Sequence, residues 1–400
     1  MMFDDAEHVV GLAARVSAFV NEVVILAEAE LDVQGELPPG RLAELRRSAR
    51  EWGVYGPQLP QAYGGMALNL LEMAPVFEAA GRSLLGPVVL NCAAPDEGNM
   101  HLLQLLGTPA QQERYLAPLA AGEIHSTFSM TEPPPGAGSD PTMIKSRAER
   151  RGDEWVIHGH KWWSTGAEAA SVYLVMAHSN PNLPPRDGTT IFLVDADNPG
   201  LEVRRRIGGL NHALGGHCEV VFRDCVVPHS AILGEEGRGY AHAQERLGPA
   251  RLTHCMRWLG VAQRALETGM DYILQREAFG DRLAGHQAMQ WMVADSEIEL
   301  HASRLMVRHA AWLIEQGYRA KQESSMAKVF VAETVNRVID RAIQMCGGTG
   351  VSDLTPLAAF YREARAFRIY DGASEVHRWV IARRLLKVMA QQLAAQAQTV

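Results

Sequence analysis

The sequence predicts an α+β protein built from three consecutive blocks: helices, then strands, then a helical bundle. Apolar residues three and four positions apart indicate an amphipathic helix between residues 9 and 26. Short runs rich in β-branched and aromatic residues fill the middle of the chain. Longer helical stripes follow residue 239. We therefore expect a helical domain at residues 1–124, a β domain at 125–234 and a four-helix bundle at 235–400.

The first block begins with a stripe formed by Val9, Leu12, Val16, Phe19, Val23 and Leu26. Short helices follow, because pairs such as Gly64-Gly65 and Gly86-Pro87 end helical runs. In the middle block, the expected strands lie at 155–157, 172–176, 191–194 and 219–222. Arg151-Gly152-Asp153 has the composition of a hairpin turn.

The last block carries three stripes with helical spacing and a fourth amphipathic segment at 376–386. The first stripe contains Leu252, Met256, Leu259, Ala262, Leu266, Met270 and Ile273. The second contains Trp291, Ala294, Ile298, Ala302, Leu305 and Trp312. The third contains Val331, Val335, Val338, Ala342 and Met345. Four helices with apolar faces can cover one another as an antiparallel bundle.

Composition narrows the class of function. A net charge of −8 argues against the concentrated basic face that nucleic acids and anionic membranes require, so neither is expected as a partner. Five cysteines without a CxxC pair argue against a disulfide framework, and an acidic start argues against a secretory signal, so we expect a cytoplasmic protein. The histidines, including His217, His254 and His377, lack metal-ligand spacing, so we assign no metal and expect capping or interface roles.

Two segments around the β block could bind a flat polar ring. The turn-rich stretch 128–140 contains Thr131 and Ser139 as hydrogen-bonding side chains, but a domain linker has the same composition. The stretch 160–166 places Trp163 beside Thr165, which could line an aromatic ligand or simply pack on the sheet.

Two segments of the bundle could bind phosphate or ribose. Arg276 and Phe279, followed by Gln287, offer a bidentate donor and an aromatic face, although an arginine at a helix end is often only solvated. The run 344–351 has three glycines in four positions, which permit close backbone approach to a ligand or form a helix cap. The sequence has no G-x-G-x-x-G between a strand and a helix.

The fifth segment, 368–378, places Asp371 before a glycine. A carboxylate at such a bend could act as a general base, or it could hydrogen-bond its own backbone in a turn.

In order and spacing, these five segments resemble the acyl-CoA dehydrogenase family of flavoproteins, from the N-terminal helices to Leu386. The resemblance implies the family's three-domain fold and oxidation of an acyl-CoA to the trans-2-enoyl-CoA, with electrons passed to FAD and then to an electron-transfer flavoprotein. It also implies a homodimer or homotetramer, because a neighbouring subunit contributes much of the FAD site. The residues implied for FAD are Phe128, Met130, Thr131, Ser139, Trp163, Thr165, Arg276, Phe279, Gln287, Gln344, Gly347, Gly348, Ala373 and Glu375.

The same resemblance makes Asp371 the catalytic base, at the position of the glutamate in the family's I-Y-E-G-T-S. Arg251 falls where members carry an arginine near the base, and Ala250 occupies the position from which some relatives supply the base instead. The residues implied to border the substrate are Ser139, Arg251, Tyr370 and Gly372.

Three features depart from the family pattern. Aspartate replaces glutamate, which shortens the reach of the base by one methylene. Two extra prolines interrupt the family's T-E-P-G-A-G-S-D run. Ala373 and Glu375 replace the usual threonine and glutamine that face the adenine.

The aspartate, with the runs 247–251, 254–257 and 375–378, most resembles the branch that handles long or branched acyl chains. Alternatives are nitroalkane oxidase, a cousin that also has an aspartate base, and acyl-CoA oxidase, both of which use oxygen. A remoter alternative is a non-catalytic, DNA-associated protein of the same fold.

Overall fold

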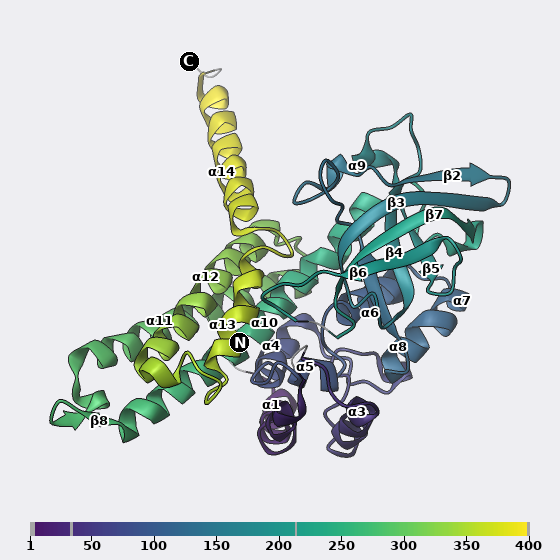
Figure 1. Ribbon diagram of the computed structural model, residues 1–400. Coiled ribbons are helices and arrows are strands. Elements are labelled where there is room, and N and C mark those ends of the chain that lie inside the picture. The colour runs from purple at the N-terminus through teal and green to yellow at the C-terminus, as the bar shows by residue number, and fades with distance from the viewer. Residues whose placement is uncertain (1–4, 33–34, 213, 398–400) are drawn as a thin grey trace. The chain divides into compact units, whose positions relative to one another are not determined.

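The computed structural model describes residues 5–32, 35–212 and 214–397. The contacts among these residues group the chain into two compact units (Figure 1). The bundle unit comprises Met1–Ser17, Asn69–Leu84 and Arg251–Val400, and the sheet unit comprises Ala18–Leu68 and Leu85–Ala250. Both units therefore combine segments that are distant in sequence, and the boundaries at 124 and 234 stay a prediction.

The predicted N-terminal helices are present. Their bounds are α1 Glu7–Phe19, α2 Ile25–Ala27, α3 Arg41–Glu51, α4 Leu70–Ala80, α5 Gly86–Val89, α6 Asp96–Leu106, α7 Pro109–Gln111 and α8 Ala117–Ala121. The first stripe is buried as far as Phe19, but a π-helical turn at Val20–Val24 then advances the buried face to Val20, Val24 and Ala27. Leu26 is consequently 70 % exposed, so the uniform period expected for this stripe is wrong after Phe19.

The helical stretch Glu7–Glu30 is long and apolar enough to cross a membrane, by length and composition only. One such helix is weak support for a span, because a core helix can have the same composition. Four positions of its stripe are at most 4 % exposed within the protein, namely Val9, Leu12, Val16 and Phe19. One face of the stretch is therefore buried, while 33 % of its 18-residue apolar window is buried in all.

The middle block forms a seven-stranded mixed sheet that contains all four predicted strand runs. The strands are β1 His125–Ser129, β2 Arg147–Arg151, β3 Glu154–Thr165, β4 Ala170–His178, β5 Thr189–Asp195, β6 Leu201–Arg206 and β7 His217–Pro228, with the short helix α9 at Pro185–Gly188. Their order is β1-β4-β2-β3-β7-β6, with β5 paired to β4. The predicted hairpin is confirmed: β2 and β3 are antiparallel, and Gly152 between them has a φ of +64°.

Side chains of β4 point alternately to the two faces of the sheet, as strand geometry requires, and both faces are buried there. Val172 and Leu174 pack with α6 and α8, whereas Tyr173 and Val175 pack with Trp155 and other residues of the sheet. The sheet is thus held on one side by the helices that precede it in sequence.

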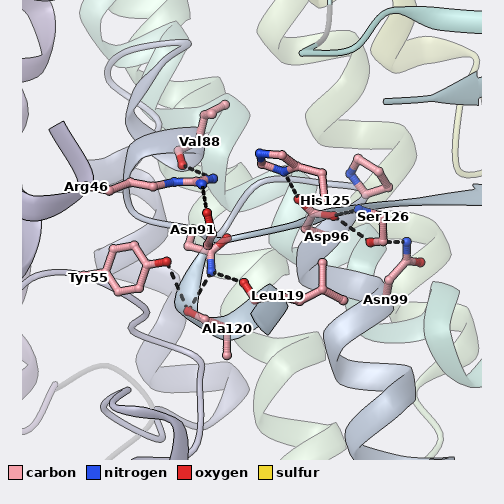
Figure 2. Close-up of polar contacts among 12 residues, drawn as sticks. Arg46, Tyr55, Val88, Asn91, Asp96, Asn99, Leu119, Ala120, His125 and Ser126 are labelled. Atoms are coloured by element: carbon pink, nitrogen blue, oxygen red, sulfur yellow. Dashed lines mark hydrogen bonds and ion pairs between the residues drawn. The ribbon is translucent and has the colours of Figure 1, made fainter. Parts of the chain in front are cut away.

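Partly buried polar contacts attach β1 to these helices (Figure 2). The carboxylate of Asp96, at the start of α6, accepts hydrogen bonds from the Ser126 backbone at 2.7 Å and hydroxyl at 2.6 Å. It also lies 2.7 Å from Nδ1 of His125. Asn99, one turn later, donates to the Ser126 hydroxyl. These contacts fix the strand that leads into Thr131.

The C-terminal block is helical, as predicted (Figure 1). Its helices are α10 Gly239–Gln275, α11 Gln287–Glu315, α12 Lys321–Cys346, α13 Leu357–Arg365 and α14 Ser374–Ala397, with a two-stranded hairpin of β8 Glu277–Ala278 and β9 Asp281–Arg282. α12 packs against α11, α13 and α14, and its predicted stripe is buried. α10 approaches α4 so closely that a Cβ on Gly260 would lie 2.0 Å from the Glu78 carbonyl oxygen.

Two predicted apolar faces stay open. On α11, Trp291 is 61 % exposed and Ile298 66 % exposed, while the buried face consists of Ser296, Leu300, Ser303, Val307, Ala310 and Ala311. The predicted α11 stripe is therefore wrong as a core face, because small and hydroxyl side chains allow closer helix packing. On α14, burial is confined largely to the first turn, and the rest extends away from the other bundle helices (Figure 1).

Candidate active site

The predicted site residues fall into two groups, one in each unit. Three of them share an unusual backbone: Trp163, Phe279 and Asp371 have φ values of +53°, +55° and +53°. Side chains other than glycine rarely adopt this region, because the Cβ crowds the backbone. Such conformations persist where surrounding structure holds them, and they are frequent at binding and catalytic sites.

In the bundle unit, Lys328 of α12 holds the segment around Asp371. Its ammonium donates to the carbonyl oxygens of Phe367 at 2.7 Å and Gly372 at 2.8 Å. The side chain is fully buried, and this burial lowers the pKa of Lys328 to about 8, which leaves the amine protonated at neutral pH. Lys328 therefore ties the two ends of the Asp371 segment together.

Two more basic side chains bind the backbone of Asp371 itself. Nε of Arg251 donates to the Asp371 carbonyl oxygen at 3.1 Å, and Nε2 of His377 lies 3.1 Å from the same oxygen. Burial, followed by the charge of Arg251, lowers the pKa of His377 to about 4, so this ring is neutral at neutral pH. The structure thus places Arg251 beside Asp371, as the sequence predicts, with a contact to the main chain.

The carboxylate of Asp371 contacts His254, which lies one turn after Arg251 on α10. Nε2 of His254 is 3.1 Å from Oδ2 of Asp371, and the two side chains are only 14 % and 17 % exposed. The capping or interface role expected for His254 is therefore wrong. His377 is likewise an internal residue, because it lies between Asp371 and the hydroxyl of Ser325.

Aromatic rings enclose this pair. The His254 ring lies 5.0 Å from the ring of Tyr370 and 6.1 Å from that of Phe367. The Tyr370 hydroxyl accepts a hydrogen bond from Trp258 at 2.5 Å, and burial raises the pKa of this tyrosine far above its usual value. The predicted substrate-side residue Tyr370 is therefore a neutral hydroxyl in an apolar wall.

In the sheet unit, a buried ion pair holds the Thr131 loop. Nζ of Lys161 donates to Oε1 of Glu132 at 2.9 Å and to the Met130 carbonyl at 3.0 Å. Burial lowers the pKa of Lys161 to about 8. Burial alone would raise the pKa of Glu132, but the Lys161 charge and the hydrogen bonds from Ser146 outweigh it and lower the pKa. Both groups are therefore charged at neutral pH.

The two extra prolines are contained in a closed loop. The Glu132 backbone donates to the Ala137 carbonyl at 2.6 Å, and Gly136 donates to the Pro133 carbonyl at 2.8 Å. The inserted loop therefore begins and ends at neighbouring residues. The Trp162 backbone on β3 still donates a hydrogen bond to the Thr131 carbonyl oxygen. Ser139, beyond the loop, is exposed, while Phe128 and Met130 pack partly against the sheet core.

A bulge in β3 presents Trp163, which is 43 % exposed. Next to it, the Thr165 hydroxyl lies 3.0 Å from Nδ1 of His217, whose Nε2 is 2.9 Å from the Asn211 amide nitrogen. Burial lowers the pKa of His217 to about 4, so the ring is neutral. A neutral ring that accepts from Asn211 donates through Nδ1, which leaves the Thr165 proton available for another acceptor. His217 is thus internal, and its expected capping or interface role is wrong.

The second FAD group lies in the bundle unit. Arg276 precedes the hairpin after α10, and Phe279 lies in the turn of that hairpin, where it is 96 % exposed. Gln287 begins α11 on the surface. Arg276 borders a surface hollow with Thr268, Asp271, Tyr272, Gln275 and Thr355.

The glycine-rich end of α12 is also open. Gln344, Gly347 and Gly348 are exposed, and Gly347 has a φ of +56° with a ψ of −133°, a conformation suited to glycine. The last two residues predicted to bind FAD lie near the start of α14. Ala373 is half-buried, and Glu375 lies in the first turn of α14. A carboxylate is favoured there by the helix dipole.

Comparison with known proteins agrees with this fold. Three family models match in order: acyl-CoA dehydrogenase N-terminal domain at 7–123, middle domain at 127–225 and C-terminal domain at 237–386. The chain belongs to the acyl-CoA dehydrogenase family, whose members are FAD-binding oxidoreductases. The three-domain fold predicted from the sequence is thereby confirmed.

Individual relatives cover nearly the whole chain. "Probable acyl-CoA dehydrogenase FadE2" of Mycobacterium tuberculosis is 40 % identical over 92 % of this chain and 93 % of its own length. Butyryl-CoA dehydrogenase from Megasphaera elsdenii has a solved structure that matches 96 % of this chain and 100 % of its own, with a TM-score of 0.86 and 27 % identity. Human acyl-CoA dehydrogenase family member 11 is 36 % identical over 94 % of this chain, but the chain spans only 49 % of that protein's length.

Sequence reasoning missed three residues that hold the site: His254, Lys161 and Lys328. Lys328 had a usable signal, since it lies three residues before Val331 and so continues the apolar stripe of α12. A lysine on such a stripe is buried only when it has partners. His254 and Lys161 gave no comparable signal, because their partners are distant in sequence.

Proposed function

We propose that the protein is an FAD-dependent acyl-CoA dehydrogenase in which Asp371 removes the α-proton of the acyl thioester. The observation that carries this proposal is the Asp371 carboxylate itself, largely buried and held by strained backbone. When bound, FAD supplies the acceptor for the β-hydride, and the product is the trans-2-enoyl thioester. Arg251 and His377 keep the main chain of Asp371 in place, and Tyr370 helps to exclude water from the carboxylate.

The described residues in each of the two units fit parts of FAD. Trp163 offers an exposed aromatic face, and Thr165 has a hydroxyl proton free to donate, as a flavin ring requires. Arg276 offers a guanidinium for the pyrophosphate, and the open glycines at 347 and 348 allow close backbone approach. Phe279 is almost fully exposed within its own chain, which suits contact with a cofactor held by a neighbouring subunit.

The substrate proposal extends to long or branched acyl chains, with an electron-transfer flavoprotein as the acceptor, as in cytoplasmic fatty acid β-oxidation. The small side chains at 248 and 250 support it, since a Cβ on Gly248 would meet nothing within 4 Å. The proposal also places the chain in the branch of the family whose base is an aspartate.

Anaerobic titration of the purified protein with acyl-CoAs of graded length tests the function. Bleaching of the flavin band by at least one acyl-CoA supports dehydrogenation, and the preferred length identifies the substrate class. Rapid oxygen consumption with a nitroalkane, and no response to any acyl-CoA, would replace the proposal with a nitroalkane oxidase. Oxygen consumption with acyl-CoA would indicate an oxidase, and a DNA mobility shift at low salt would revive the DNA-associated alternative.

Replacing Arg276 with alanine is expected to release FAD while the protein folds normally. The guanidinium is exposed, so its removal costs little packing, but it removes the side chain best suited to a bidentate grip on phosphate. The flavin-to-protein absorbance ratio after gel filtration measures the loss. Arg282→Ala, on β9 of the hairpin that follows Arg276, is the matched control and should keep its FAD. Full retention by Arg276→Ala would remove this residue from the cofactor site.

A homodimer or homotetramer is part of the proposal. Its support is the exposed apolar face of α11, with Trp291, Ile298 and Leu305 at heptad spacing. A second open face lies on α14, where Trp379, Leu386, Met389 and Leu393 are each more than half exposed. Exposed apolar faces of this kind are typical of contacts between copies of a chain.

The double substitution Trp291→Lys with Ile298→Lys is expected to lower the molecular mass of the assembly and to reduce its FAD content. A lysine at the centre of a buried apolar contact would place a charge there without a partner or water, which weakens the contact. Sedimentation velocity gives the mass. Leu183→Lys, which charges an exposed leucine in a loop of the sheet unit, should leave the assembly unchanged. Equal masses for all three proteins would exclude the α11 face from the interface.

A further inference from the structure

The contact between His254 and Asp371 has a defined direction. Nε2 of His254 lies 3.1 Å from Oδ2 of Asp371, within ion-pair distance. An ionised carboxylate can only accept, so a favourable contact at this distance requires the proton on Nε2, in the neutral ring and in the imidazolium alike. Because both side chains are more than four-fifths buried, water competes weakly for either partner.

Packing restricts the orientation of the His254 ring. Phe367 and Tyr370 lie on its sides, at centroid distances of 6.1 Å and 5.0 Å. The ring stands on α10, a rigid element, whereas Asp371 stands in a short segment between helices with a φ of +53°. A donor on a rigid helix can therefore fix a carboxylate whose own backbone is strained.

Three cationic groups surround this pair: Arg251 and Arg257 on α10 and Lys328 on α12. Cys255, Tyr370 and His377 are neutral neighbours, and the carboxylates of Glu333 and Glu363 act on Lys328 and Tyr370. Burial raises the pKa of Cys255 to about 12 and lowers that of His377 to about 4, so neither changes charge near neutrality. The Lys328 amine, with a pKa near 8, adds positive charge below that pH.

We propose that His254 is a positioning residue for the base, whose Nε2–H holds the Asp371 carboxylate in one orientation and keeps it ionised until it takes the α-proton. This inference rests on the proposed function. In the proton-transfer step, the proton moves from the α-carbon to the carboxylate, and His254 retains its own proton. His254 acts through Asp371 and does not contact the reacting carbon.

The test is the pH dependence of kcat/KM, measured by anaerobic flavin reduction with the holoenzyme. His254→Phe keeps an aromatic ring between Phe367 and Tyr370 but removes the donor. Its acid limb is expected to move to higher pH by about one unit or more, the typical effect of losing a hydrogen bond to a charged group. His254→Gln retains an N–H donor and should lie closer to the wild type, while KM changes little in either variant. Acid limbs that match the wild type in both variants would overturn the proposal.

A double-mutant cycle in urea unfolding separates this inference from the proposed function. His254→Phe should lower the unfolding midpoint more in the wild type than in an Asp371→Asn background, because only the charged partner is left without its donor. If the two substitutions are coupled but no acyl-CoA reduces the flavin, the contact between His254 and Asp371 stands and the proposed dehydrogenase function is rejected. Additive effects, together with an unchanged acid limb in an active enzyme, would reject the role of His254 alone.

Discussion

Replacing Asp371 with asparagine is expected to leave a folded, yellow protein whose flavin is no longer reduced by acyl-CoA. An amide cannot accept the α-proton, and loss of a general base typically slows a reaction by about 100- to 10,000-fold. Asparagine is also one of the few residues that tolerate a positive φ, so the strained backbone at +53° should survive the change. Anaerobic stopped-flow measurement of flavin absorbance gives the rate.

Two further variants complete this test. Asp371→Glu keeps a carboxylate and restores the family's usual length, so partial activity is expected. Asp353→Asn removes an exposed carboxylate from the loop after α12 and should reduce the flavin at the wild-type rate. Rapid bleaching of the Asp371→Asn flavin by acyl-CoA would show that another residue is the base.

Replacing Glu132 with glutamine is expected to destabilise the protein by about 3–5 kcal/mol, since it leaves the buried Lys161 ammonium without a countercharge. Glu132 also accepts hydrogen bonds from the Lys145 and Ser146 backbones at 2.6 Å and 2.9 Å, so the loop that follows Thr131 should loosen as well. Urea unfolding gives the stability, and the flavin-to-protein ratio should fall in parallel.

The matched control is Glu149→Gln, which breaks the exposed ion pair with Arg147 on the same sheet and should leave the unfolding midpoint unchanged. Adding Lys161→Met to Glu132→Gln should recover part of the loss, because no unpaired charge remains. An unfolding midpoint for Glu132→Gln equal to that of the wild type would contradict the role given to the pair.

The pH dependence of stability provides an independent check on Lys161. Its pKa is about 8 in the folded protein, below the ordinary value of 10.5, so the unfolded chain binds more protons between these values. Stability from this group therefore rises as pH increases from about 8 to about 10.5. In the Lys161→Met variant, the free energy of unfolding should no longer show this rise between pH 8 and 10.5.

Local chemistry accounts for the parts that the sequence predicted correctly. Short β-branched runs became strands, and the stripe led by Val331 became the buried face of α12. The family resemblance predicted that Arg251 lies near Asp371, and the fold brings the two into contact across 120 residues. The secondary-structure predictions succeeded because periodicity is a property of neighbouring residues.

Tertiary structure decided the rest. The π-helical turn after Phe19 changed which residues face the core, and α11 buried serines and alanines in place of Trp291 and Ile298. The partners of Asp371 and of Glu132 are a histidine and lysines brought together from separate elements, and no local pattern encodes such pairs. The sequence by itself determined most of the helices and strands, and the family resemblance proposed Asp371 as the base. The contacts that surround Asp371 depend on burial, which arises only when distant segments pack.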